Sequence, residues 1–199
     1  PGGDISEPVS QATLRIVKVF WGLDSNLAYK RHFPAINWLT SYSLYVDRIG
    51  GWFEENVNKD WLKLRQELMK LLQEEAELDE IVKMVGMDAL SAPDRLKMEA
   101  SRSIREDYLH QNSFHEVDTF TSLLKQYRLL ELILHFYHKA GKAIKSNVSI
   151  NKLIKIPALE KIGRAKYIRE RYVTKEYDEI LDEIDSQIDE LIKEGAEEL

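Results

Sequence analysis

The strongest constraint on the fold is a long helical pattern between residues 117 and 140. Apolar side chains recur there at steps of three and four residues, which places them on one face of an α-helix. The stretch LLELILHFYH is apolar almost all round, so we expect the middle of this helix to be buried on several sides. The stripe consists of Val117, Phe120, Leu123, Leu124, Tyr127, Leu130, Leu134 and Tyr137.

Two earlier segments carry helical signals as well. From residue 61 onward an apolar face is expected to continue to Val85, and Gly86 is expected to end that helix. Ser91, Pro93 and Asp94 then predict a new helix start, with a hydroxyl cap, a first-turn proline and an acid at the positive end of the dipole. The predicted inward positions are Trp61, Leu64, Leu68, Leu71, Leu72, Leu78, Ile81, Val82 and Val85 in the first helix, and Leu96, Ala100, Ile104 and Tyr108 or Leu109 in the second.

The remaining segments are shorter. Residues 11–31 predict two short helices broken near Gly22–Asp24, and the pair Gly50–Gly51 predicts a second break. The segment HFPAINW should be extended or a turn, because a residue before proline is pushed out of the α region. The segment QNSF should end the second helix, and two short helices are expected around 149–163, separated by Pro157. The fold class is therefore mainly α.

Composition narrows the class of protein. The 199 residues are 44% apolar and 31% charged, as in globular proteins. A net charge of −6 argues against a general nucleic-acid binder, which usually carries a basic face. No apolar run approaches the ~18 residues of a membrane span, so we expect no direct membrane insertion. Cysteine is absent, which excludes disulfides and thiolate metal sites within this sequence.

The last 27 residues form an acidic amphipathic pattern. Ile180, Ile184, Ile188 and Leu191 follow one another at steps of four, four and three, which predicts a helix with a narrow apolar seam. Two interpretations are open at this point. The helix could pack on its own domain, or it could face a partner protein.

Most catalytic and metal-binding motifs fail on inspection. The patterns GxxxxGK[ST], GxGxxG and GxSxG are absent from the sequence. His115 and Glu116 begin like HExxH, but Thr119 stands where the second histidine would be. His135 and His138 are three residues apart and could share a metal, although a pair of partly buried or surface histidines is the more common situation. The residues alone define no complete active site.

One aromatic position has two interpretations. Phe33 in HFPAINW stands directly before Pro34. It could be an ordinary core residue at a helix–loop corner, or its flat face could be a surface for a flat ligand.

Several stretches, in order from Pro1 to about Tyr172, resemble the C-terminal part of the catalytic A-type chain of archaeal and vacuolar-type ATP synthases. They are PGGDISEPV, TLRIVKVFWGLDSNLAYKRHFPAINWLTSYSLY, GMDALSAPDR and FHEVDTFTSLLKQYRLL. The resemblance implies a fragment with the last piece of an α/β nucleotide-binding domain at 1–50, a helical domain at 51–172 and an acidic amphipathic helix at 173–199.

The related β chains of F-type synthases form their adenine pocket from an aromatic before Pro-Ala and from a Phe-x5-Phe-Thr element. This similarity implies adenine-binding roles for Phe33, Pro34, Phe114, Phe120 and Thr121. It also implies contact with the central stalk, through the opening loop and through a turn whose acidic run is thinner than in the F-type chains. The implied stalk residues are Gly3, Asp4, Met87, Asp88, Ala89, Leu90 and Ser91.

The resemblance further implies the chemistry and the partners of the complete catalytic chain. These are ATP or ADP with magnesium, the B-type chains of the same hexamer, the proteins of the central stalk, and a cytoplasmic position on the inner face of the membrane. The phosphate loop, the magnesium ligands and the catalytic glutamate are expected upstream of Pro1, so the fragment alone should be inactive. The alternative from another class is a helical protein-interaction module that binds no nucleotide.

Overall fold

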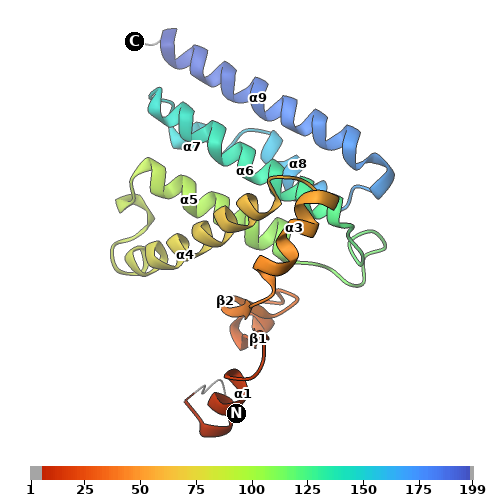
Figure 1. The fold of residues 1–199 in the computed structure, drawn as a ribbon. Coiled ribbons are helices and arrows are strands. Elements are labelled where there is room, and N and C mark those ends of the chain that lie inside the picture. Colours follow the sequence, from red (N-terminus) through yellow and green to blue (C-terminus); the bar gives the residue numbers. More distant parts are fainter. Residues whose placement is uncertain (1–5, 198–199) are drawn as a thin grey trace. The chain divides into compact units, whose positions relative to one another are not determined.

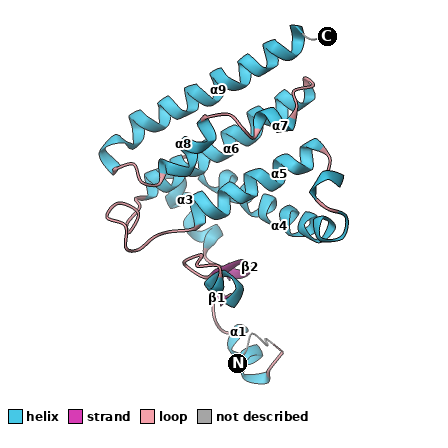
Figure 2. Cartoon of the chain, turned by 180° about the vertical axis from the view of Figure 1, so that it is seen from behind, coloured by secondary structure: helices cyan, strands magenta, loops and turns pink. Residues whose placement is uncertain are grey.

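The computed structural model describes residues 6–197, which divide into one unit up to Leu62 and another from Lys63. Apart from two short strands, the elements of this part of the chain are helical, so the mainly α prediction is confirmed (Figures 1 and 2). Within residues 6–197, no helix combines the length and the apolar character that crossing a bilayer requires. Each unit is described by itself.

The first unit pairs two strands with three helices. Strand β1 runs antiparallel to β2, from Val19 opposite Ser43 to Leu23 opposite Ile36. Asp24 ties the two strands together, because its carboxylate accepts the Asn26 N–H at 2.8 Å and the Asn37 side-chain amide at 3.0 Å. The elements are α1 (Pro8–Leu14), β1 (Val19–Leu23), α2 (Ser25–Tyr29), β2 (Ile36–Ser43) and α3 (Val46–Asn56).

Two predictions for this unit are wrong. The expected first helix of 11–31 is replaced in large part by β1, whose exposure alternates along VFWGL as in a strand with one covered face. The expected break at Gly50–Gly51 is absent, because α3 runs through both glycines. Gly50 is buried, and a Cβ atom there would lie 2.7 Å from Leu62 Cδ1. This glycine therefore permits close packing rather than a turn. The extended prediction for HFPAINW is confirmed in its second half by β2.

The second unit is helical throughout, and α6 is its central element. Helices α5, α8 and α9 contact α6, and α9 also contacts α8. The elements are α4 (Trp61–Val85, which begins two residues before the unit), η1 (Met87–Ala89), α5 (Ala92–Ser103), the π-helix η2 (Ile104–Leu109), α6 (Leu123–Lys145), α7 (Ile150–Leu153), α8 (Ala158–Ala165), η3 (Glu170–Tyr172) and α9 (Val173–Glu197).

The core of this unit confirms the inward positions in the middle of the predicted helices. Leu132, Ile133 and Phe136 are at most 1% exposed, so α6 is buried on several sides as expected. The far end of α4 differs: Ile81 is 42% and Val85 62% exposed, so their predicted inward placement is wrong. The other predicted positions that are buried are Leu68, Leu71 and Leu72 in α4, and Leu96, Ala100 and Ile104 in α5 and η2.

The start of α6 also differs from the sequence prediction. Val117 and Phe120 lie in a loop, and the helix begins at Leu123. Ser122 caps it by accepting the Lys125 N–H at 3.1 Å. Glu170, far along the chain, holds Ser122 by accepting its N–H and its hydroxyl at 3.0 and 2.7 Å. A tertiary contact therefore fixes this boundary, and the two apolar residues before it share the helical spacing without being helical.

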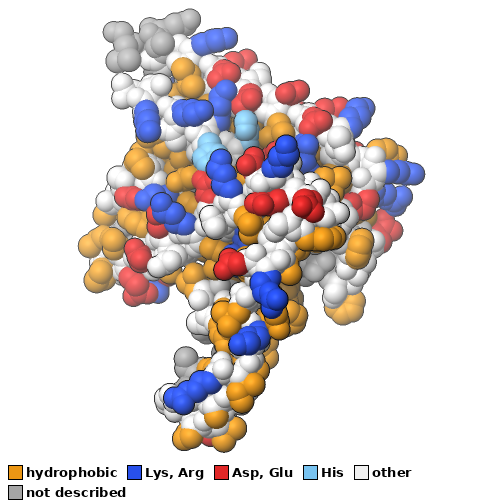
Figure 3. All heavy atoms as spheres, viewed as in Figure 1, with side chains coloured by type: hydrophobic (Ala, Val, Ile, Leu, Met, Phe, Trp, Pro, Cys, Tyr) orange, Lys and Arg blue, Asp and Glu red, His pale blue; other side chains and the backbone are white. Residues whose placement is uncertain are grey.

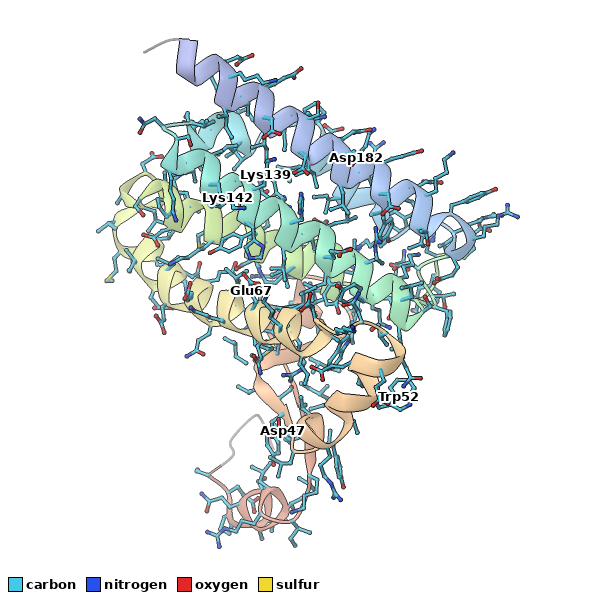
Figure 4. The ribbon with its side chains drawn as sticks, turned by 45° about the horizontal axis from the view of Figure 1, so that its top comes forward. Asp47, Trp52, Glu67, Lys139, Lys142 and Asp182 are labelled. Atoms are coloured by element: carbon cyan, nitrogen blue, oxygen red, sulfur yellow. The ribbon has the colours of Figure 1, made fainter. Side chains whose placement is uncertain are left out.

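Helix α9 packs on its own unit. Ile184 and Ile188 are fully buried and Ile180 is 5% exposed, as the apolar seam predicts, and the buried seam extends back to Tyr177. Lys139 of α6 lies beside α9, where its Nζ is 3.3 Å from Asp185 and 2.9 Å from Asp189 (Figure 4). Acidic and basic side chains are interspersed over the visible face of the helical unit (Figure 3).

Candidate functional site

The first candidate element is the connection between α2 and β2. Arg31 has a φ of 57°, and the Phe33–Pro34 peptide is cis. His32 is 5% exposed and its ring centroid lies 5.7 Å from that of Trp38, so it anchors the connection in the first unit. The Phe33 side chain is 50% exposed and Pro34 is exposed as well. Within the first unit, Phe33 is therefore a surface aromatic.

The second candidate element is the loop at residues 110–122, which connects η2 with α6 (pink in Figure 2). Phe114 is 98% exposed and Phe120 is 70% exposed. Thr121 is half-buried, and its carbonyl accepts the Gln126 side-chain amide at 3.0 Å. The loop therefore presents two phenylalanine rings on the surface of the second unit.

The three phenylalanines thus come from both units. Phe33 belongs to the first unit, and Phe114 and Phe120 belong to the second. Each ring is at least half exposed. Large exposed aromatics cost free energy unless a ligand or another chain segment covers them. Their expected meeting around one adenine ring stays a prediction.

The third candidate element is the turn between α4 and α5. Gly86 has a φ of +86°, which side-chain-bearing residues rarely adopt, and η1 follows it. Ser91 caps α5 as predicted: its Oγ accepts the Asp94 N–H at 3.3 Å and donates to the Asp94 carboxylate at 2.6 Å. The hydrogen bond from the Ser91 hydroxyl lowers the pKa of Asp94.

The turn carries more apolar surface than the sequence prediction included. Met87, Asp88 and Ala89 are exposed. Met84 and Val85, at the end of α4, are 77% and 62% exposed. They were missed because a helical stripe assigns its apolar members to the core, and only their position at the helix end could have indicated otherwise. Of the remaining residues predicted to contact the stalk, Leu90 is half-buried, and Gly3 and Asp4 lie outside the described residues.

Behind this turn lies a charged pair in a cavity of about 220 Å³. Glu75 accepts from Arg105 at 2.8 Å and is 8% exposed. Burial raises the pKa of Glu75, and the guanidinium of Arg105 partly opposes this rise. The pair joins α4 to the π-helix.

The histidines bind carboxylates on different helices. His135 Nε2 lies 2.8 Å from Asp185 Oδ1 of α9, and His138 Nε2 lies 2.5 Å from Glu67 Oε1 of α4. Both are partly exposed. No group of three or more His, Cys, Asp or Glu residues that could hold a metal occurs in the part of the chain that the structure describes.

Comparison with known proteins identifies the relatives of this arrangement. A family model described as the C-terminal domain of V and A type ATP synthase matches residues 50–154. The chain belongs to this family. A second model, the nucleotide-binding domain of the ATP synthase alpha/beta family, matches residues 1–43. Family membership supports the interpretation as part of a rotary ATPase over that of a nucleotide-free interaction module.

The V- and A-type ATP synthase family is represented by very similar alpha chains. The V-type ATP synthase alpha chain of Acetivibrio thermocellus is 65% identical over 192 residues, which are 96% of this chain and 33% of the relative. That of Clostridioides difficile is 66% identical over 200 residues, which are 100% of this chain and 34% of the relative. The chain therefore spans about a third of the length of these curated relatives.

The fold has a counterpart among solved structures. The ATP synthase subunit NeqB from Nanoarcheaum equitans superposes with a TM-score of 0.58 at 23% identity. The match covers 69% of this chain and 32% of that one. At this identity the likeness concerns the fold alone.

Proposed function

We propose that this chain supplies the adenine side of the ATP site, and the lever that contacts the central stalk, in the catalytic alpha chain of a rotary V- or A-type ATP synthase. The observation that carries the proposal is the pair of exposed aromatic elements, Phe33 in a segment that matches the nucleotide-binding domain and Phe114 with Phe120 in the helical domain. A flat aromatic face can stack on a base without reading its hydrogen-bonding edge.

Under this proposal the chain binds and orients, and the rest of the alpha chain performs phosphoryl transfer. The adenine ring would be enclosed by Phe33, Pro34, Phe114, Phe120 and Thr121. Magnesium, bound with ATP or ADP, would neutralise charge on the phosphates, and its ligands would come from the remainder of the alpha chain. The neighbouring B-type chain of the hexamer would complete the site.

The proposal also divides the chain into parts with different tasks. Residues 1–50 would complete the nucleotide-binding domain, and residues 51–172 would form the helical lever. The acidic helix at 173–199 would follow the lever and pack on it.

The turn between α4 and α5 would be the stalk contact. Exposed Met84, Val85 and Met87 offer apolar surface, and Asp88 adds one charge. Gly3 and Asp4 of the opening loop would contribute to the same interface. The assembly would lie on the cytoplasmic side of the membrane as a peripheral complex.

The stalk contact is tested by crosslinking in the assembled complex. Cysteine introduced at Ala89, which is exposed in the turn, should crosslink to a protein of the central stalk. Crosslinks only to peripheral proteins of the complex would remove this assignment.

The adenine assignment is tested in the full-length alpha chain within its complex. Phe114→Ala should weaken binding of ATP and leave binding of inorganic tripolyphosphate, which has no base, unchanged. Tyr45→Ala is the control, because Tyr45 is 43% exposed and has no assigned role. Equal losses for ATP and tripolyphosphate, or no loss for either, would remove the adenine pocket.

A further inference from the structure

The loop at residues 110–122 is held by its own hydrogen bonds rather than by apolar burial. Asp118 is 3% exposed, and its carboxylate accepts the Asn112 N–H at 2.7 Å. The Gln111 side-chain amide donates to the Asp118 carbonyl at 2.8 Å. A buried carboxylate is stable only when it is hydrogen-bonded or paired, so Asp118 closes the base of the loop.

His115 forms the second fixed point of the loop. Its Nδ1 accepts the N–H groups of Val117 at 3.1 Å and Asp118 at 3.3 Å. Its ring centroid lies 4.4 Å from that of Tyr167. Two N–H donors directed at Nδ1 require a lone pair there, so the imidazole is neutral and carries its proton on Nε2. A proton on Nδ1 would face two other N–H groups.

The charged groups around His115 come from the loop and from the segment after α8. Asp118 and Glu116 belong to the loop, and Glu116 pairs with Arg169 at 3.0 Å. Lys166 Nζ lies 5.6 Å from the centre of the Tyr167 ring and donates to the carbonyls of Glu106 and His110. A cation therefore already lies on the Tyr167 side of the imidazole, which opposes a second positive charge there.

Phe114 is placed by these two fixed points. Its N–H donates to the Asn112 side-chain oxygen at 3.0 Å, and the His115 N–H donates to the Asn112 carbonyl at 3.1 Å. The backbone on both sides of Phe114 is thereby fixed, while its ring is 98% exposed. Such an arrangement orders an exposed ring before any ligand covers it, and preorganisation of this kind reduces the entropy lost on binding.

We propose that His115 is a positioning residue for the nucleotide site: its neutral Nδ1 holds the loop so that Phe114 is oriented toward the adenine ring. This inference rests on the proposed function. It makes base recognition sensitive to protonation, because a proton on Nδ1 releases the Val117 and Asp118 amides and with them the orientation of Phe114. Phosphate binding lies outside this effect.

Two substitutions separate the acceptor from the ring. His115→Asn places an amide oxygen close to the position of Nδ1 and keeps the acceptor without a titrating group. His115→Phe keeps a ring against Tyr167 and removes the acceptor. In the full-length alpha chain within its complex, His115→Phe should weaken ATP binding about tenfold through loss of two hydrogen bonds. His115→Asn should stay close to wild type, and binding of inorganic tripolyphosphate should be unchanged in both. His138→Phe is the control, since His138 binds Glu67 away from this loop.

A second measurement does not depend on how well His115→Phe folds. Acidification should weaken ATP binding relative to tripolyphosphate binding in the wild type, and less so in His115→Asn. Amide exchange at Val117 and Asp118 should accelerate in His115→Phe but not in His115→Asn. Equal ATP affinity in the wild type and His115→Phe, an equal loss in both variants, or the same acid response in wild type and His115→Asn would overturn the inference.

The two proposals fail in different ways. If Phe114→Ala leaves ATP binding unchanged, the adenine pocket is wrong, whatever amide exchange reports about the loop. If Phe114→Ala weakens ATP binding but His115→Phe does not, the pocket stands and the positioning role of His115 is wrong.

Discussion

His135 and Asp185 join the central helix to the last helix of the chain. The imidazole Nε2 of α6 lies 2.8 Å from the carboxylate of α9, and Lys139 approaches the same carboxylate at 3.3 Å. Burial acts to raise the pKa of Asp185, but the hydrogen bonds and charges of His135 and Lys139 outweigh it, so the pKa is lowered. This contact therefore has a pH dependence with a definite sign.

We predict that Asp185 stabilises the α6–α9 contact at neutral pH and loses this effect in acid. A carboxyl whose pKa is lower in the folded state contributes stability above its unfolded value, about 3.9 for aspartate, and loses it as pH falls through the folded pKa. Asp185→Asn should lower the melting temperature at pH 7, with a cost on the order of 0.5 kcal/mol for a pair this exposed. The difference from wild type should shrink below about pH 4.

The matched control for Asp185 is Asp182→Asn. Asp182 is an exposed residue of the same helix (Figure 4). It should change the melting temperature little in neutral or acidic solution. An Asp185→Asn effect of the same size in neutral solution and in strong acid would contradict the linkage argument.

We predict that α9 contributes strongly to the stability of the helical unit. Ile184 is fully buried in the α9 seam. Ile184→Ala should therefore reduce the free energy of unfolding by about 2–5 kcal/mol, measured by chemical denaturation. Ile192→Ala, at a half-buried position of the same helix, should cost clearly less. A loss for Ile184 no larger than that for Ile192 would mean that α9 does not pack as described.

We predict that the cap of α5 stabilises the unit independently of any stalk protein. Ser91→Ala removes the acceptor for the Asp94 N–H and should cost about 1 kcal/mol. Ser91→Asp should retain most of that stability, because aspartate also caps helices well. The cost should be the same in the isolated chain and in the complex. An Ala variant as stable as wild type would show that the cap is not needed.

We predict graded effects at Phe33 on nucleotide binding. In the full-length alpha chain, Phe33→Ala should weaken ATP binding by roughly ten- to a hundredfold, since a base–aromatic stack contributes about 1–3 kcal/mol. Phe33→Leu should lose less, because it keeps apolar area but not the flat face. Thermal stability is measured on the same variants. A large fall in melting temperature with unchanged affinity of the folded fraction would return Phe33 to the status of a packing residue.

We predict that the 199-residue chain alone does not hydrolyse ATP, because its sequence contains no GxxxxGK[ST] motif to bind the phosphates. Phosphate release is measured on the purified chain, with the full-length alpha chain in its complex as positive control. Steady turnover by the isolated chain, freed of contaminating ATPases, would contradict this prediction.

The sequence was most informative where a pattern was long and local. The seam of α9, the middle of α6 and the Ser91 cap were all predicted, because apolar periodicity and capping depend on neighbouring residues. Strand β1 was missed because five residues of VFWGL cannot separate strand from helix without the partner β2. The start of α6 depends on Glu170, and the role of Gly50 on Leu62, so neither could be read from local spacing.

The candidate site shows the same division. A pattern of residue types pointed to Phe33, Phe114 and Phe120, and each is exposed in its own unit. It did not reveal the hydrogen bonds of His115 and Asp118, since His115 was weighed only as part of a failed metal motif. A histidine that accepts two backbone N–H groups has no signature in composition or spacing.

The π-helix η2 can be understood as an α-helix that has gained one residue. Residues Ile104–Leu109 follow α5 directly, and the loop with Phe114 begins where they end. Each residue of an α-helix turns the chain by about 100°, so one extra residue rotates everything after it by that angle. Deletion of a single residue within 104–109 would restore an unbroken α-helix and swing the loop to another side of the bundle. The direction in which Phe114 emerges is thus recorded in the length of the preceding helix, where a one-codon change could rewrite it.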